Sequence, residues 1–185
     1  MEGKDRVMKN IGIVGLGYVG TAVESVFSKY FNIKSYDTQK NKGNCETLDD
    51  LILSCELIFV CVPTPMKKDG SCDISIVESV VADLNKAYDN NSIIVDKVLA
   101  IKSTIPPGTL DKFTKEYKNL GFVFNPEFLT EANFIDDFKN QNRIIIGGER
   151  PSTTKLRQVY SLVFPNTPII KTGSKTAEMV KYMTN

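Results

Sequence analysis

The stretch Asn10–Gly20, with the sequence NIGIVGLGYVG, constrains the fold of this chain more than any other feature. Its first half is an apolar run that suits a buried strand, and its second half places Gly15, Gly17 and Gly20 in the pattern G-x-G-x-x-G. Apolar residues at helical spacing follow at once: Val19, Ala22, Val23, Val26, Phe27 and Tyr30. The glycines therefore lie between a predicted strand and a predicted helix, which is the setting of a dinucleotide-binding fingerprint.

Each of the three glycines has its own physical reason in such a fingerprint. Gly15 allows a tight turn, Gly17 lets the backbone approach a pyrophosphate, and Gly20 lets the helix pack closely on the strand. The start of the helix offers free N–H groups and a partial positive charge to the same pyrophosphate. A glycine triplet alone is also typical of an ordinary turn, so the interpretation depends on the residues that follow it.

The next predicted strand, residues 32–37, ends in a carboxylate. Asp37 lies 17 positions beyond Gly20, close to where an acidic residue accepts hydrogen bonds from the adenosine ribose. A carboxylate at this place repels a 2′-phosphate, so we predict NAD rather than NADP as the cofactor. Lys40 and Lys42 follow closely, and we interpret them as part of a solvated loop.

Length and composition exclude several classes of protein. The 185 residues suffice for one well-buried domain, and the 42% hydrophobic and 24% charged residues are typical of a globular protein. A net charge of +1 gives no electrostatic reason to expect nucleic acid or an anionic membrane as a partner. The apolar stretches are too short to cross a bilayer, and the charged first ten residues do not form a signal peptide.

The cysteine and histidine content restricts the chemistry. Cys45, Cys55, Cys61 and Cys72 form no C-x-x-C pair, so we expect reduced thiols with structural roles in a cytoplasmic protein and no metal site. Histidine is absent, which excludes dehydrogenases that use a histidine base. Acid–base chemistry must come from Glu, Asp, Lys, Cys or bound water.

Strand and helix patterns alternate along the rest of the chain. We predict further strands at 57–62, 98–102, 121–124, 143–148 and 169–170, and helices at 47–54, from about 73, at 110–119, at 151–163 and from 174. The apolar residues 93–95 leave the start of the fourth strand uncertain. The alternation predicts an α/β fold with a doubly wound, mostly parallel sheet of Rossmann type and helices on both faces. Polar segments follow the strand ends, where ligands bind in such sheets.

Two of these polar segments suggest chemistry. After the fifth strand, Asn125 can cap a helix with Pro126 at its first position, which would place Glu127 and Glu131 on one face. Acids in a first turn also simply complement the helix dipole, and that alternative stays open. In the last helix Lys181 lies four residues before the final residue, Asn185, a spacing that is often just solvent-facing.

Six segments in order resemble the N-terminal domain of the UDP-glucose/GDP-mannose dehydrogenase family, from about Lys9 to the last residue. They are GLGYVG, CVPTP, KSTIPPGT, NPEFLTEANFIDDF, RIIIGG and TAEMVKYMTN. The resemblance implies NAD-dependent oxidation of the C6 alcohol of a nucleotide sugar to a carboxylate, in two steps through an aldehyde and a cysteine thioester. It favours UDP-glucose, oxidised to UDP-glucuronate, although the sugar is not encoded here.

The resemblance also implies roles for individual residues. The implied catalytic residues are Thr104, Glu127, Glu131, Lys181 and Asn185. Thr104 would help hold a water, Lys181 and Asn185 would stabilise charge on the C6 oxygen, and one of the two glutamates would activate water. We favour Glu127 for that step. The implied cofactor-binding residues are Gly15, Leu16, Gly17, Tyr18, Val19, Gly20, Asp37, Val62, Pro63, Thr64, Ser103, Thr104 and Glu131.

The chain also departs from the family pattern. Ala132-Asn133 replaces a small Gly-containing turn, and Gln141 replaces a proline. The family's nucleophilic cysteine lies in a glycine-rich motif beyond the end of this chain, and none of the four cysteines lies in such a motif. We therefore expect residues 1–173 to form the NAD-binding domain and 174–185 to begin a connecting helix that could form a homodimer. The substrate-binding C-terminal domain would be absent, and the chain alone would be inactive.

Two alternatives remain open at this stage. A β-hydroxyacid dehydrogenase shares a Rossmann domain and a Lys-x-x-x-Asn helix, but its Ser-Gly-Gly segment has no counterpart here. A non-catalytic NAD-binding or assembly module is the other alternative, which the early end of the chain favours.

Overall fold

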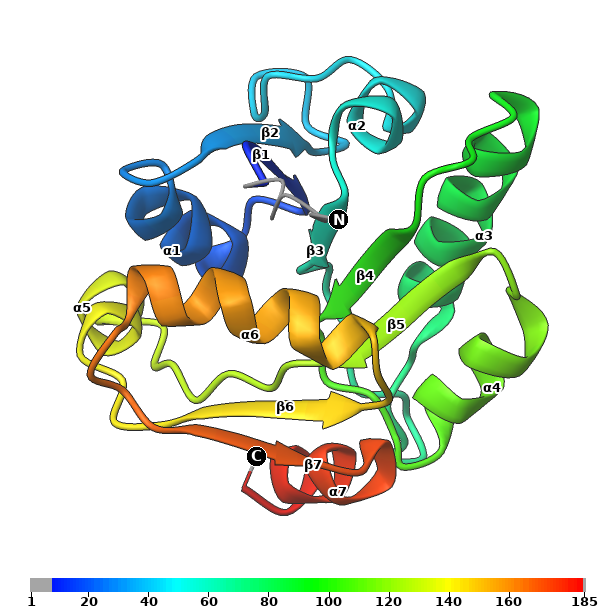
Figure 1. The fold of residues 1–185 in the computed structure, drawn as a ribbon. Helices are drawn as coiled ribbons and strands as arrows, with labels where there is room; N and C mark the ends of the chain where they lie inside the picture. Colours follow the sequence, from blue (N-terminus) through cyan, green and yellow to red (C-terminus); the bar gives the residue numbers. More distant parts are fainter. Residues whose placement is uncertain (1–7, 185) are drawn as a thin grey trace.

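Seven strands form one sheet in the computed structural model, which describes residues 8–184 (Figure 1). The strands are β1 (Asn10–Val14), β2 (Asn32–Tyr36), β3 (Leu57–Val60), β4 (Lys97–Ile101), β5 (Leu120–Phe124), β6 (Ile144–Gly148) and β7 (Ile169–Thr172). The helices are α1 (Tyr18–Phe27), α2 (Leu48–Ser54), α3 (Ser75–Asn90), α4 (Thr109–Glu116), α5 (Phe134–Lys139), α6 (Ser152–Val163) and α7 (Ser174–Thr184). The predicted alternation of strands and helices is confirmed.

The order of the strands determines where a ligand-binding crevice can form in the sheet. The order is β2-β1-β3-β4-β5-β6-β7, and neighbouring strands are parallel except for the antiparallel pair β5 and β6. The chain leaves β1 for β2 on one side and returns to β3 on the other, which opens a crevice at the carboxyl ends of β1 and β3. The predicted doubly wound, mostly parallel sheet is therefore confirmed.

Two hydrophobic layers cover the sheet. Helices α1, α5 and α6 cover one face (Figure 1). They pack around Phe27, whose ring makes edge-to-face contacts with Phe59 of β3 and Tyr160 of α6. On the other face α2, α3, α4 and α7 pack on a second apolar cluster. Strands β1, β3 and β4 are buried on both faces, which explains their nearly continuous apolar sequences.

Several element boundaries differ from the sequence prediction; α4, for example, ends at Glu116 and not at 119. Helix α1 ends at Phe27, and Tyr30 lies half-exposed in the following turn rather than on the helix face. Strand β3 ends at Val60, two residues early, because the chain turns towards Pro63 and Pro65. Residues 93–95 are not a strand, and Ile94 is exposed.

Within residues 8–184, no helix combines the length and apolarity that crossing a bilayer requires.

Candidate active site

A single cavity of about 710 Å³ lies at the carboxyl ends of β1, β2, β3, β4 and β5. Twelve predicted site residues line it: Gly15, Gly17, Tyr18, Val19, Asp37, Val62, Pro63, Thr64, Ser103, Thr104, Glu127 and Glu131. Leu16, Gly20 and Lys181 are not on its wall but contact residues that are. Asn185 lies outside the described residues. The cavity thus collects residues from segments far apart in the sequence.

The glycine loop has the shape that the fingerprint requires. Gly15 has φ of 89°, and a Cβ on Gly20 would collide with its carbonyl oxygen, so both positions are restricted to glycine. Gly17 differs, because an added Cβ would meet no heavy atom within 4 Å. It borders the cavity at the start of α1, where free N–H groups point outwards. An anionic group can therefore approach the backbone at Gly17 without a steric obstacle.

Asp37 is fixed against this loop. Its Oδ2 accepts a hydrogen bond from the N–H of Leu16 at 2.7 Å, and its Oδ1 accepts one from the N–H of Gln39 at 2.9 Å. Lys42 is exposed in its loop, as predicted, and it also lines the cavity, where its Nζ donates to the carbonyl oxygen of Leu16 at 3.4 Å. The chain folds back at Gly43, whose φ is 84° and which pairs with Tyr36 at the end of β2.

The opposite wall of the cavity comes from β3 and β4. The hydroxyl of Ser103 donates to the carbonyl oxygen of Val62 at 2.7 Å, which joins the two loops that leave these strands. Ile76 and Val80 of α3 add an apolar patch to the wall. The sequence analysis missed these two residues, because nothing distinguishes them from the other apolar residues of an amphipathic helix.

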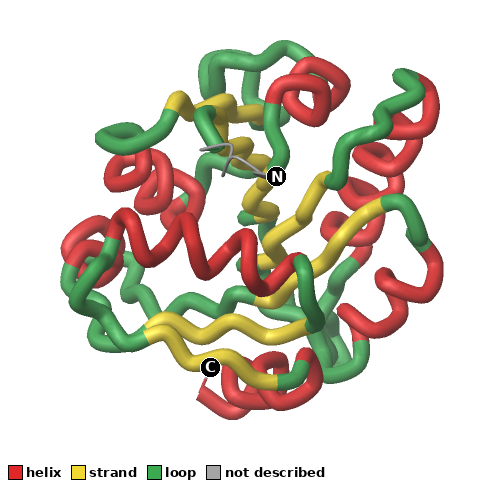
Figure 2. Tube along the Cα trace, viewed as in Figure 1, coloured by secondary structure: helices red, strands yellow, loops and turns green. Residues whose placement is uncertain are grey.

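The segment after β5 is not the helix that we predicted. Residues 125–133 form an irregular loop between β5 and α5, drawn as loop in Figure 2. Asn125 cannot cap a helix, because its side chain is buried and already used: Oδ1 accepts from the hydroxyl of Tyr160 at 2.6 Å, and Nδ2 donates to the carbonyl oxygen of Ile145 at 2.8 Å. Glu127 and Glu131 both reach the cavity, but from a loop rather than from one helix face.

Glu127 and Lys181 form a largely buried ion pair at the edge of the cavity. Lys181 Nζ lies 3.1 Å from Glu127 Oε1, and their side chains are 7% and 13% exposed. Glu127 Oε2 accepts from the N–H of Leu129 at 2.7 Å, and the ammonium also lies 5.7 Å from the ring centroid of Phe128. Because both oxygens of the carboxylate are held, its orientation towards the cavity is fixed.

A second buried cation lies beneath this loop. Lys102 Nζ donates to Asn125 Oδ1 at 3.0 Å and lies 5.5 Å from the ring centroid of Phe138. Burial lowers the pKa of Lys102 to about 8, and the negative charge of Glu127 opposes this shift. The side chain thus anchors the start of the loop that carries Glu127.

This pKa predicts an unusual dependence of stability on pH. Lys102 is charged in both the folded and the unfolded chain below about pH 8, so the cost of burying the charge is fully present there. Between about 8 and the ordinary value of 10.5 only the unfolded chain holds the proton, so stability rises with pH. Relative to Lys102→Met, the free energy of unfolding of the parent should rise across this range by up to about 3 kcal/mol.

Urea unfolding at a series of pH values measures this difference, and Lys175→Met on the surface controls for the loss of a lysine in general. A difference between the parent and Lys102→Met that stays constant with pH would contradict the assigned pKa.

The cysteines do not supply a nucleophile to the cavity. Cys61 lines its floor, but burial raises the pKa of this thiol to about 12, and burial likewise raises the pKa of Cys55 to about 12. The thiolate is the reactive form, so both are inert thiols at neutral pH. Both side chains are buried in the hydrophobic clusters, as expected for cysteines with a structural role.

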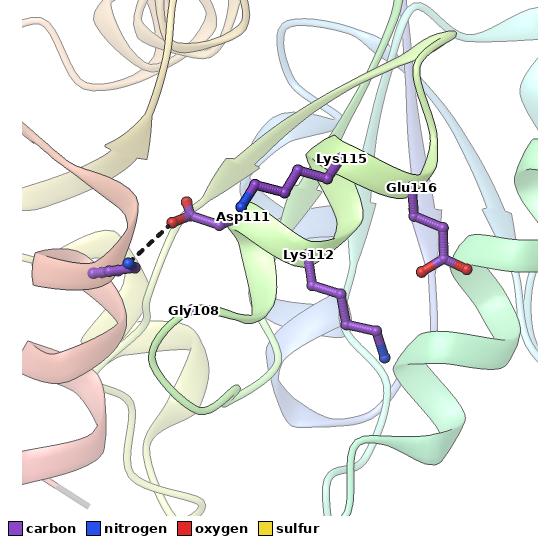
Figure 3. Close-up of a pocket in the computed structure, with 6 residues that line it drawn as sticks. Gly108, Asp111, Lys112, Lys115 and Glu116 are labelled. Carbon is purple, nitrogen blue, oxygen red and sulfur yellow. Dashed lines mark ion pairs between the residues drawn. The ribbon is translucent and has the colours of Figure 1, made fainter.

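A shallower hollow of about 490 Å³ lies at the start of α4 (Figure 3). It contains none of the predicted site residues. Two of its lysines are paired with acids, Lys112 with Glu78 at 2.8 Å and Lys175 with Asp111 at 3.5 Å. The cavity at the carboxyl ends of the strands is therefore the candidate active site.

The cavity suits a dinucleotide. Its volume is within the range of ligand pockets, roughly 300–1,000 Å³. It combines an open backbone approach at Gly17, a fixed carboxylate at Asp37 one strand away, and an ion-paired carboxylate at Glu127 at the opposite end. These are groups that can bind a pyrophosphate, bind a ribose and act on a substrate. Along the edge of the sheet the order is Asp37 after β2, the glycine loop after β1 and Glu127 after β5.

Comparison with known proteins agrees with this reading of the cavity. Residues 34–164 match the UDP-glucose/GDP-mannose dehydrogenase family, NAD binding domain. The chain is 29% identical over 213 residues to UDP-glucose 6-dehydrogenase of Rickettsia bellii, covering 95% of this chain and 48% of that protein. It is 31% identical to an uncharacterized protein of Methanocaldococcus jannaschii, over 95% of this chain and 23% of that protein.

Solved structures show the same fold. A UDP-glucose dehydrogenase from the hyperthermophilic archaeon Pyrobaculum islandicum superposes with a TM-score of 0.84 at 24% identity, covering all of this chain and 50% of that one. The chain thus spans half or less of the length of each of these three proteins.

Proposed function

The chain belongs to the UDP-glucose/GDP-mannose dehydrogenase family, in its NAD-binding domain, and we propose that it serves the oxidation of UDP-glucose to UDP-glucuronate. The observation that carries this proposal is the single cavity that brings the Gly17 cradle, Asp37 and the Glu127–Lys181 pair together. Bound NAD would accept a hydride from C6 of the sugar. The residues of this chain bind the cofactor and handle the protons and charge.

Each end of the cavity has its own task in this proposal. The backbone at Gly15–Gly20 holds the pyrophosphate, and Asp37 accepts hydrogen bonds from the adenosine ribose. The loops at 62–64 and 103–104 border the cofactor, and Thr104 helps to hold a water. At the substrate end, Lys181 stabilises negative charge on the C6 oxygen, and we assign Asn185 the same task.

Glu127 is the residue that we assign to water activation. Its carboxylate is oriented by Lys181 and by the N–H of Leu129, whereas Glu131 is exposed on the cavity wall. A general base must be held within reach of the proton that it takes, and the two contacts of Glu127 supply that constraint. Glu131 then borders the cofactor and the substrate.

The remaining parts of the proposal concern the whole protein. Residues 1–173 would be the cofactor domain, 174–185 the start of a connecting helix, and the thioester cysteine and the sugar pocket would come from a part outside this chain. Met179, Tyr182 and Met183 are exposed on α7 and would be covered in a homodimer. We assign the protein to the cytoplasm, where its four cysteines stay reduced.

Titration calorimetry and a turnover assay test the proposal. The chain should bind NAD with measurable heat, and it should not produce UDP-glucuronate from UDP-glucose and NAD when assayed alone. Failure to bind NAD would overturn the cofactor assignment. Formation of the acid by this chain alone would overturn the assignment of the nucleophile to another part of the protein.

A further inference from the structure

Helix α4 begins without a capping side chain of its own. Its N-cap residue is Gly108, with φ of 95°, and no side chain of the preceding loop accepts a hydrogen bond from the first turn. The cap comes from α7 instead. The carboxylate of Glu178 accepts from the N–H of Gly108 at 2.6 Å and from the N–H of Leu110 at 2.8 Å.

Glu178 is a carboxylate that is fully buried between two helices. It is 0% exposed, and burial raises its pKa while the two N–H donors oppose that rise. A buried carboxylate is costly unless it is hydrogen-bonded, and here both oxygens are used by the positive end of a helix. The sequence analysis assigned no role to this residue, because its partners lie 68 and 70 positions earlier in the chain.

The two elements that Glu178 joins both lead to the candidate active site. On one side, Gly108 ends the loop that begins at Ser103 and Thr104 on the cavity wall. On the other side, Lys181 follows Glu178 by three residues, so the two lie on the same face of α7. A helix fixed at Glu178 is therefore fixed within one turn of the ammonium that contacts Glu127.

The other contacts between α4 and α7 are nearer the surface. Asp111 extends from α4 towards α7, where it pairs with Lys175 at 3.5 Å (Figure 3) and accepts from the hydroxyl of Ser174 at 2.6 Å. The side chains of Lys175 and Asp111 are 70% and 40% exposed, and exposed pairs of this kind contribute little to structure. Among the polar contacts described between these helices, the bond from the N–H of Leu110 to Glu178 is the buried one.

We propose that Glu178 is a positioning residue, which fixes α7 on the start of α4 and thereby holds Lys181 against Glu127. The role of Lys181 in catalysis rests on the proposed function, but its placement by Glu178 does not. Ala177, the neighbour of Glu178, lies fully buried against Gly147 of β6, where any larger residue on the strand would collide with it. Packing thus sets the distance of α7 from the sheet, and Glu178 sets its position relative to α4.

Glu178→Gln is the variant that tests this proposal. Glutamine has nearly the same size, but only its oxygen accepts, so its NH₂ group faces one of the two backbone donors and leaves it unpaired. No cavity forms. Glu178→Asp, which keeps the charge but shortens the reach, should have an intermediate effect. Asp111→Asn is the matched control, because it alters the exposed contact between the same two helices.

Limited acetylation of the folded chain, read lysine by lysine by mass spectrometry, measures the result. In the parent, Lys181 should react slowly, as should the other buried lysines, Lys97 and Lys102. In Glu178→Gln, Lys181 should react about ten times faster, as expected when a local contact opens. Lys97 and Lys102 should keep the rates of the parent, and Asp111→Asn should leave all three unchanged.

Three results would overturn the proposal. One is an unchanged rate at Lys181 in Glu178→Gln. Another is a joint rise at Lys97, Lys102 and Lys181, which would indicate loss of the whole fold rather than release of α7. The third is an equal effect of Asp111→Asn. The reaction is run without NAD, so a protein that failed to bind NAD would refute the proposed function and leave this measurement valid.

Discussion

Gly17→Val is expected to lower the affinity for NAD by at least about 100-fold, close to 3 kcal/mol, while leaving the folded chain intact. The reason is that a Cβ at this position meets no heavy atom within 4 Å, and the residue lines the cavity. The backbone of Gly17 has φ of −76° and ψ of −161°, which any residue adopts. The new side chain therefore occupies the place of the pyrophosphate without straining the loop.

Gly173→Val is a matched control for this variant. Gly173 also directly precedes a helix, and a Cβ there also meets no heavy atom within 4 Å, but the residue does not line the cavity. Calorimetric titration should give the parent affinity for Gly173→Val, and thermal unfolding should give similar midpoints for both variants. An equal loss of NAD affinity in the two variants, or an unaltered affinity in Gly17→Val, would place the pyrophosphate elsewhere.

Local patterns were enough to predict the fold and the meeting of Gly15, Gly17 and Asp37 at one edge of the sheet. The apolar run before Gly15 and the helical spacing after it lie within a few residues of the glycines, and Asp37 follows at the end of the next strand. In a parallel sheet, all carboxyl ends of the strands meet at one edge, so residues placed at those ends can be expected to meet. The order of strands and helices along the chain is therefore enough to predict that the glycine loop and Asp37 meet.

The other half depends on contacts that the sequence does not display. Asn125 has the right neighbours for a helix cap, but its side chain is used by Tyr160 and Ile145, which lie 35 and 20 residues away. Glu178 caps a helix that lies far earlier in the chain. Capping rules apply to adjacent residues, so they predicted a helix that is absent at Asn125 and overlooked the cap that α4 receives from α7.

The sequence analysis also missed the contact of Lys42 with the cavity, for a different reason. A polar, lysine-containing loop correctly indicates exposure, but the turn at Gly43 also brings Lys42 onto the cavity beside Leu16, which no local pattern indicates. The residue bears directly on the choice between NAD and NADP, because a cation near the adenosine ribose favours a 2′-phosphate whereas Asp37 disfavours one. The preference for NAD thus depends on which of two opposite charges dominates.

Asp37→Asn is expected to remove that preference. At roughly 5 Å and an effective dielectric constant near 20, a carboxylate repels each unit of phosphate charge by about 3 kcal/mol, so the parent should prefer NAD by at least about 100-fold. Asparagine can keep the bond from the N–H of Leu16 through its oxygen, and water can replace it at the exposed N–H of Gln39. The loop therefore keeps its shape while the charge is lost.

The affinity of Asp37→Asn for NAD should fall about tenfold, because the ribose hydroxyls lose a charged acceptor, and its affinity for NADP should rise. If Lys42 is the cation that then meets the 2′-phosphate, the double variant Asp37→Asn/Lys42→Met should lose the gain for NADP and keep the NAD affinity of the single variant. Competitive titration of both cofactors against all three proteins measures this coupling. A parent that binds NADP as tightly as NAD would show that Asp37 does not face the ribose, and the assignment of the adenosine end of the cavity would then be wrong.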